Sequence, residues 1–139
     1  MVQMPAHPKD EGPESVNCNL PADSTHKNVD FHIPLARTAG ATEYEAMVVE
    51  MIPQRRSSTW NIDTIRQVAA QRRPVIVRGQ LLYDSKHVVN NDPAHPAPGQ
   101  PKRFSLWEVH PITEFYVCPR EACDDKNLAE WQAMGKVQP

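Results

Sequence analysis

The sequence predicts a small, mainly β domain built as an OB-like Greek-key barrel, with one helix between the third and fourth strands and a short C-terminal helix. Three observations predict this class. Several segments have the alternating or β-branched composition of strands. A single helical pattern interrupts them, at residues 62–72. Finally, Gly79 and Pro111 interrupt the two longest strand patterns, where a coiled barrel strand has to bend.

The N-terminal half predicts an arm, two strands and a helix. Residues 1–27, rich in Pro, Asp and Asn, indicate an irregular arm with at most a short edge strand. Segment 28–36 alternates apolar and polar residues, as a half-buried strand does, and the more apolar segment 44–52 predicts a second strand. Asn61 can cap a helix over about 62–72, and Trp60 is expected to fasten that helix to the rest of the domain.

The C-terminal half predicts two longer strands and a second helix. Residues 75–83 form a strand pattern with a bulge at Gly79, and 84–103 is a long polar loop with four prolines. Segment 104–118 is the longest strand pattern, anchored by Trp107, and Pro111 requires a bulge or an unpaired edge there. Asp124 can cap a short helix that ends at Gly135.

This element order predicts a barrel plugged by its first helix. The expected organisation is an arm at 1–27, the OB-like barrel at 28–123, and the C-terminal helix and tail at 124–139. An open α+β sheet is the alternative. The length of 139 residues and the hydrophobic content of 40% suit one domain with a real core.

The charge is unevenly distributed along the chain. The formal net charge is -2, yet residues 55–103 contain nine Lys and Arg against three Asp. A basic middle can attract phosphates or an acidic partner, although solvated charges on a helix and a loop are the simpler interpretation. No apolar run is long enough to span a bilayer, and the first residues lack the apolar core of a signal peptide, so we expect a soluble chain.

Three cysteines leave several interpretations open. Cys18, Cys118 and Cys123 could be reduced and partly buried, could form one disulfide, or could bind zinc together with a histidine. The spacing of Cys118 and Cys123 is looser than that of the usual pair of zinc ligands.

Five short motifs resemble a group of small, mostly uncharacterised bacterial proteins with OB-type or staphylococcal-nuclease-like barrels. They are ES-x-N-C at 14–18, D-x-H-I-x-L at 30–35, V-V-E-M-x-P at 48–53, G-x-L-x-x-D-x-x-H at 79–87 and S-L-W-E-V-H-P-I at 105–112. The W-E-[IV]-H-P portion is the most specific. The resemblance implies a barrel, and its relatives are often secreted. It implies no activity, because the residues of the nuclease reaction do not map onto this chain.

Polar pairs on the predicted strands suggest a metal site. Histidine and carboxylate ligands suit zinc, manganese or iron, and an ion with an open position could activate water for hydrolysis. The alternative is that each pair closes a structural hydrogen-bond network. Glu50 could add a further carboxylate. The candidate metal ligands are Asp30, His32, Asp84, His87, Glu108 and His110.

A binding or interaction domain is the leading functional hypothesis. OB barrels bind single-stranded nucleic acid or oligosaccharide across their middle strands and loops. The overall negative charge and the aromatic content of 6% argue against strong sequence-independent binding of nucleic acid. A protein partner in a larger assembly is equally open. The candidate ligand-binding residues are Arg78, Tyr83, Lys86, His87, Lys102 and Arg103.

Overall fold

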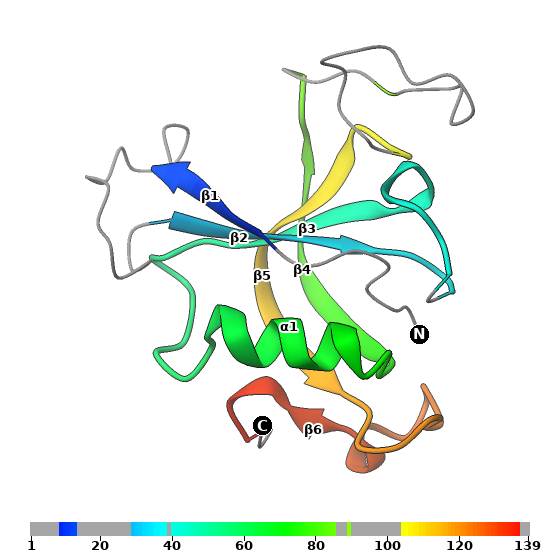
Figure 1. Ribbon diagram of the computed structural model, residues 1–139. Coiled ribbons are helices and arrows are strands. Elements are labelled where there is room, and N and C mark those ends of the chain that lie inside the picture. The colour runs from blue at the N-terminus through cyan, green and yellow to red at the C-terminus, as the bar shows by residue number, and fades with distance from the viewer. Residues whose placement is uncertain (1–8, 14–28, 39, 86–88, 90–103, 137–139) are drawn as a thin grey trace.

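The computed structural model describes residues 9–13, 29–38, 40–85, 89 and 104–136 (Figure 1). Six strands and one α-helix make up most of this part, together with three short 3-10 segments. The elements are β1 (Lys9–Pro13), β2 (Val29–Leu35), η1 (Glu43–Glu45), β3 (Met47–Met51), α1 (Ile62–Ala70), β4 (Val75–Tyr83), β5 (Trp107–Val117), η2 (Leu128–Glu130), β6 (Gln132–Ala133) and η3 (Met134–Lys136).

The strands form one mixed sheet in the order β1-β2-β3-β5-β4, with the short β6 paired to β5 (Figure 1). Neighbours are antiparallel except β3 and β5, which run parallel. Among the described residues, β1 and β4 lie at opposite edges and do not pair, so the sheet is open. The mainly β class is therefore confirmed, as is the helix between β3 and β4.

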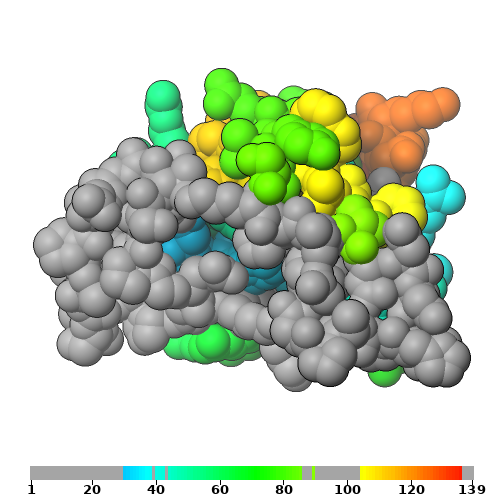
Figure 2. Space-filling view, turned by 90° about the horizontal axis from the view of Figure 1, so that it is seen from above, coloured from blue at the N-terminus to red at the C-terminus, as the bar shows by residue number. Residues whose placement is uncertain are grey.

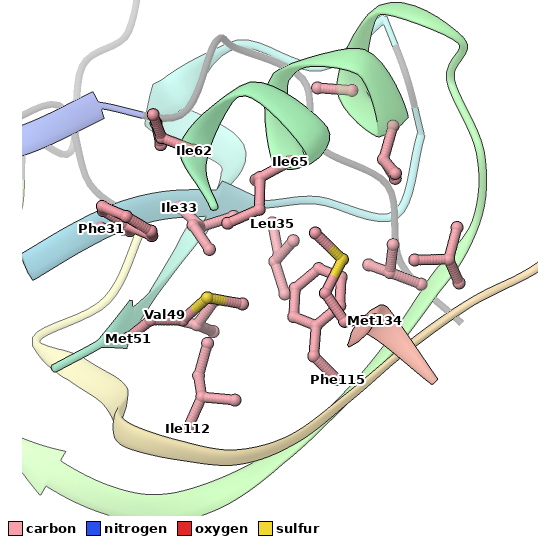
Figure 3. Close-up of a cluster of buried hydrophobic side chains, with 14 residues drawn as sticks. Phe31, Ile33, Leu35, Val49, Met51, Ile62, Ile65, Ile112, Phe115 and Met134 are labelled. Atoms are coloured by element: carbon pink, nitrogen blue, oxygen red, sulfur yellow. The ribbon is translucent and has the colours of Figure 1, made fainter. Parts of the chain in front are cut away.

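The core lies between α1 and one face of this sheet (Figure 3). Alternate residues of β2 point into it, as the sequence pattern predicted, and so do Val49 and Met51 of β3. The core side chains include Phe31, Ile33, Leu35, Val49, Met51, Ile62, Ile65, Val68, Ile112, Phe115 and Val117. Full burial of side chains of this size contributes about 1.5–3 kcal/mol each.

Two residues that precede α1 have the roles that the sequence predicted. The Asn61 side chain accepts a hydrogen bond of 2.8 Å from the Thr64 backbone N–H, which confirms the predicted cap. Trp60 is partly buried against the core, as expected for a residue that fastens the helix.

Two irregularities separate β5 from a regular strand. Arg78 pairs with Glu114 but Gly79 pairs with Ile112, so Thr113 is an extra residue. From Gly79 to Leu81, β4 advances two residues while β5 advances three, from Ile112 to Val109. The predicted bulges at Gly79 and Pro111 are therefore confirmed.

These bulges correct the facing that regular alternation predicts for β5. Regular alternation predicts that Leu106, Glu108, His110 and Ile112 share one face. Ile112 instead lies in the core with Phe115, while His110 meets Asp30 of β2 and Glu50 of β3, and Glu108 contacts His110. The reason is that each extra residue reverses the alternation of the strand.

Two further predictions are corrected by the structure. Trp107 is 50% exposed and does not anchor the core. The segment predicted as a C-terminal helix consists of η2, β6 and η3 instead, because residues 132 and 133 pair with the end of β5. β1 is a short strand at the edge of the sheet, within residues 1–27; its sequence KDEGP has no strand signal, and the strand forms by pairing with β2.

Cys118 and Cys123 form a disulfide. This excludes the reduced and zinc-bound alternatives for these two residues. Cys18 lies outside the described residues. The bridge closes a short loop immediately after β5 and precedes the segment that returns as β6.

Candidate functional site

Polar side chains from three adjacent strands meet on the face of the sheet opposite the core. His32 of β2 pairs directly with Glu50 of β3. The next pair in the same register, Ile33 with Val49, faces the core. β3 in turn runs parallel to β5 with Val49 opposite Val109. The register therefore places Asp30 and His32 of β2, Glu50 of β3, and Glu108 and His110 of β5 on the same face.

His110 is at the centre of this cluster. Its Nδ1 lies 3.1 Å from Glu108 Oε1 and 3.2 Å from Glu50 Oε2. Its Nε2 lies 3.9 Å from Asp30 Oδ2. The other oxygen of Glu50, Oε1, lies 3.5 Å from Nδ1 of His32. One imidazole is thus surrounded by three carboxylates, and one of these reaches a second imidazole.

The cluster is buried. Asp30 is 1% exposed, Glu108 3%, and Glu50 and His110 8% each. Three ionised carboxylates carry three negative charges, whereas the two histidines supply at most two positive ones. Desolvating ionised groups costs several kcal/mol per ion unless opposite charges and hydrogen bonds compensate. A bound cation, or protons held within the cluster, would provide such compensation.

Three members of the cluster can converge on one ion. Asp30, Glu50 and His110 each offer a ligand atom, and these three atoms lie within 4.8 Å of one another. Two carboxylates and one imidazole form a ligand set suited to zinc, manganese or iron.

The structure brings together most of the predicted metal ligands. Asp30, His32, Glu108 and His110 all lie in the cluster. Glu50, named in the sequence only as an additional carboxylate, proves to be the residue that joins both histidines. No sequence signal marks this role, because it follows from the pairing of β2 with β3.

The other two predicted ligands are Asp84 and His87. Asp84 follows the end of β4, where its backbone N–H donates to the Leu106 carbonyl at 2.9 Å. It is not one of the three residues whose ligand atoms converge. His87 lies outside the described residues.

Of the predicted ligand-binding residues, the structure describes two, both on β4: Arg78 in the middle of the strand and Tyr83 at its end, opposite Trp107 at the start of β5. In Figure 2 the bright green atoms at the end of β4 and the yellow atoms at the start of β5 lie side by side on the surface. Tyr83 is 52% exposed and its ring meets that of Trp107 edge-on, with centroids 5.2 Å apart. Arg78 pairs with Glu114 at 3.0 Å. Lys86, His87, Lys102 and Arg103 lie outside the described residues.

Large apolar side chains are exposed at this end of the sheet. They come from β4, from the start of β5 and from the residues just before it: Leu81, Leu82, Tyr83, Phe104 and Trp107. We call this set the exposed apolar end. Exposed apolar patches are typical of binding sites.

No protein-family model matches this chain, and no curated protein or solved structure matches it either. We therefore infer function from the buried polar cluster and from the exposed apolar end. Among the described residues, no helix combines the length and the apolar composition needed to cross a membrane.

Proposed function

We propose that the protein binds a divalent metal ion through Asp30, Glu50 and His110. The observation that supports this is their convergence: ligand atoms from three different strands lie within 4.8 Å of one another in a buried cluster. Residues held by adjacent strands of one sheet are rigidly positioned, as a metal site requires. Zinc, manganese and iron suit this ligand set.

Metal analysis of the purified protein tests the proposal. We expect one zinc or manganese ion per chain after incubation with the metal and removal of the excess. Asp30→Asn and His110→Ala should abolish this stoichiometry. Glu114→Gln is a matched control. It neutralises a carboxylate on β5, the strand that carries His110, and this carboxylate pairs with Arg78 outside the cluster.

The opposite result is equally informative. If the wild-type protein remains metal-free with each metal while its circular dichroism shows a native fold, the cluster is a structural polar network. Asp30→Asn would then change the stability of the fold without affecting any binding. A metal that survives in both cluster variants would place the ion elsewhere.

A hydrolase is the activity class that such an ion would support. A bound divalent ion with an open position lowers the pKa of its water and makes hydroxide available at neutral pH. The deep burial of Asp30 and Glu108 means that a substrate needs an opening of the covering residues. The test is hydrolysis of bis(p-nitrophenyl) phosphate and p-nitrophenyl acetate by the metal-loaded protein. Activity lost in His110→Ala but kept in Glu114→Gln would support it, and inactivity with both probes would argue for metal binding alone.

We also propose that the exposed apolar end binds single-stranded nucleic acid, as an OB-like barrel would. The supporting observation is the pair of half-exposed rings of Tyr83 and Trp107, joined by Phe104 at 66% exposure. Exposed aromatic rings stack on bases. In the sequence, Lys102 and Arg103 directly precede Phe104, and Lys86 follows Tyr83 by three residues, so phosphate-binding charge lies close along the chain. This proposal includes closure of the open sheet into an OB-like barrel, because the expectation of nucleic-acid binding comes from that fold.

Titration of tryptophan fluorescence with short single-stranded oligonucleotides at two salt concentrations tests this binding. Binding should weaken as salt rises. Tyr83→Ala should weaken it by roughly 5- to 150-fold, from about 1–3 kcal/mol per stacked base. Absence of any fluorescence change at low salt would remove nucleic acid as a ligand and leave a protein partner for this surface.

A further inference from the structure

The two ring nitrogens of His110 have different surroundings, and this difference indicates how the ion would be held. Nδ1 lies 3.1 Å from Glu108 and 3.2 Å from Glu50, both within hydrogen-bond distance. Nε2 faces Asp30 at 3.9 Å, which is longer than a direct hydrogen bond. We propose, on the basis of the metal site above, that His110 binds the ion through Nε2 and that Glu108 is the positioning residue that fixes this choice.

An imidazole that binds a metal ion through one ring nitrogen carries its proton on the other. In His110, an Nδ1–H would donate a hydrogen bond to Glu108 Oε1, which leaves Nε2, 3.9 Å from Asp30 Oδ2, to bind the ion. The arrangement is that of metal-binding histidines in general, in which the second nitrogen donates to a carboxylate that fixes tautomer and orientation.

The separation of Nε2 and Asp30 suits an ion between them. Zinc holds nitrogen and oxygen ligands at about 2.0–2.2 Å, which places two ligands about 3.4 Å apart at a tetrahedral angle. The 3.9 Å between Nε2 and Oδ2 has to shorten by only about 0.5 Å to reach that geometry.

Glu108 and Glu50 have different roles in this arrangement. Glu108 lies two residues before His110 on β5 and contacts its Nδ1, but it is not among the residues whose ligand atoms converge. Glu50 lies on β3, and its two oxygens reach His110 and His32. Membership of the convergent set assigns Glu50 as the second carboxylate ligand, and its Oε2 has to move from Nδ1 toward Nε2 to reach the ion. Glu108 acts on the ion only through His110.

The first experiment measures the tautomer of His110 in zinc-loaded protein. Long-range ¹H–¹⁵N correlation of ¹⁵N-histidine-labelled protein should show His110, assigned through His110→Ala, with its proton on Nδ1 and with zinc on Nε2. A proton on Nε2 in the zinc-loaded protein would overturn the proposed arrangement.

The second experiment measures zinc affinity by calorimetry with competing chelator. Glu108→Ala should weaken zinc binding by about 10- to 100-fold, as removal of a histidine-orienting carboxylate does. Glu108→Gln should lie between Glu108→Ala and wild type, because an amide oxygen can still accept from Nδ1. Glu114→Gln should bind as wild type does.

The outcomes separate the two proposals. Wild-type protein that binds no zinc refutes the metal site and, with it, the role of Glu108 that rests on that site. Wild-type protein that binds zinc, with Glu108→Ala folded and binding equally tightly, refutes the positioning role alone. If Glu108→Ala does not fold, Glu108→Gln and the wild-type spectrum decide the question.

Discussion

Replacement of Gly79 by alanine tests the packing that holds the site in place. A Cβ at this position would meet the Pro111 backbone oxygen, would lie 2.5 Å from Val109 Cγ1, and would lie 3.0 Å from the Ile112 Cα. Two of these three atoms belong to backbone, which cannot rotate out of the way as a side chain does. Gly79→Ala therefore requires the two bulged strands to separate.

The expected cost follows from this geometry. Overpacking in a well-packed region costs about 1–3 kcal/mol, and backbone clashes place Gly79→Ala at or above the upper end. For a domain of this size, about 3 kcal/mol lowers Tm by roughly 10 °C or more. We expect that shift in thermal unfolding followed by circular dichroism.

Gly40→Ala is the matched control for this substitution. No atom lies within 4 Å of a Cβ built at Gly40, and the residue is exposed, so its Tm should stay within about 2 °C of wild type. A Gly79→Ala protein as stable as Gly40→Ala would refute the close approach of β4 to Pro111. It would also remove the support for the facing of His110, which precedes that proline.

Three further predictions concern other parts of the fold. Asn61→Ala removes the cap of α1 and should lower the free energy of unfolding by about 1 kcal/mol in urea titration, whereas Asn61→Asp should retain most of it. Opening the Cys118–Cys123 bridge should lower the free energy of unfolding by about 2 kcal/mol, because the unfolded chain gains entropy. Dithiothreitol should therefore lower the Tm of the wild type but not that of Cys123→Ala. Equal shifts in the two proteins would contradict a stabilising bridge. The pKa of Tyr116 is raised because its O–H donates to Glu114, with burial and the carboxylate charge acting in the same direction. Glu114→Gln should therefore lower the pH at which Tyr116 ionises, measured as the phenolate absorbance that is missing in Tyr116→Phe. The stabilisation from this hydrogen bond is present below about pH 10 and is lost as pH rises through the raised pKa of Tyr116.

The strands that the sequence predicted well are those with a strong local pattern. The predicted 75–83 matches β4 at both ends, and the alternation of 28–36 defines β2 and its core face. In both cases apolar periodicity and nearby turn residues agree with the tertiary contacts. β1 could not be predicted, since its charged and Gly-Pro sequence forms a strand only through the partner β2.

The C-terminal segment shows why a correct pattern can give the wrong element. Trp131 and Met134 are buried, as a helical stripe required, but a spacing of three residues also fits 3-10 turns separated by a short strand. Pairing with β5 decides between them, because residues 132 and 133 extend the sheet there. That choice depends on contacts distant in sequence.

The candidate site was predictable in its residues but not in its connections. Asp30, His32, Glu108 and His110 stood out because polar residues on apolar strands need partners. The sequence could not show that Glu50 links both histidines, because that depends on the register of β2 with β3 and on the parallel pairing of β3 with β5. No local sequence pattern predicts that β3 and β5, which are separated in the chain by α1 and β4, pair in parallel.

The two bulges of β5 allow the core and the site to exist on one strand. With neither bulge, Ile112 would face away from Phe115 and leave the core, which would forfeit about 1.5–3 kcal/mol of burial. With only the bulge at Thr113, the alternation would stay reversed, and Glu108 would point into the apolar space beneath α1.

An ionised carboxylate placed there costs several kcal/mol. The second bulge, opposite Gly79, restores the alternation, so that Val109 packs against the core while Glu108 and His110 face Asp30 and Glu50. The Gly79–Pro111 contact is therefore a condition of the site as well as of the fold. For this reason Gly79→Ala should disturb the orientation of His110 even where the protein still folds, and a shifted His110 ¹⁵N spectrum in the surviving folded fraction would show it.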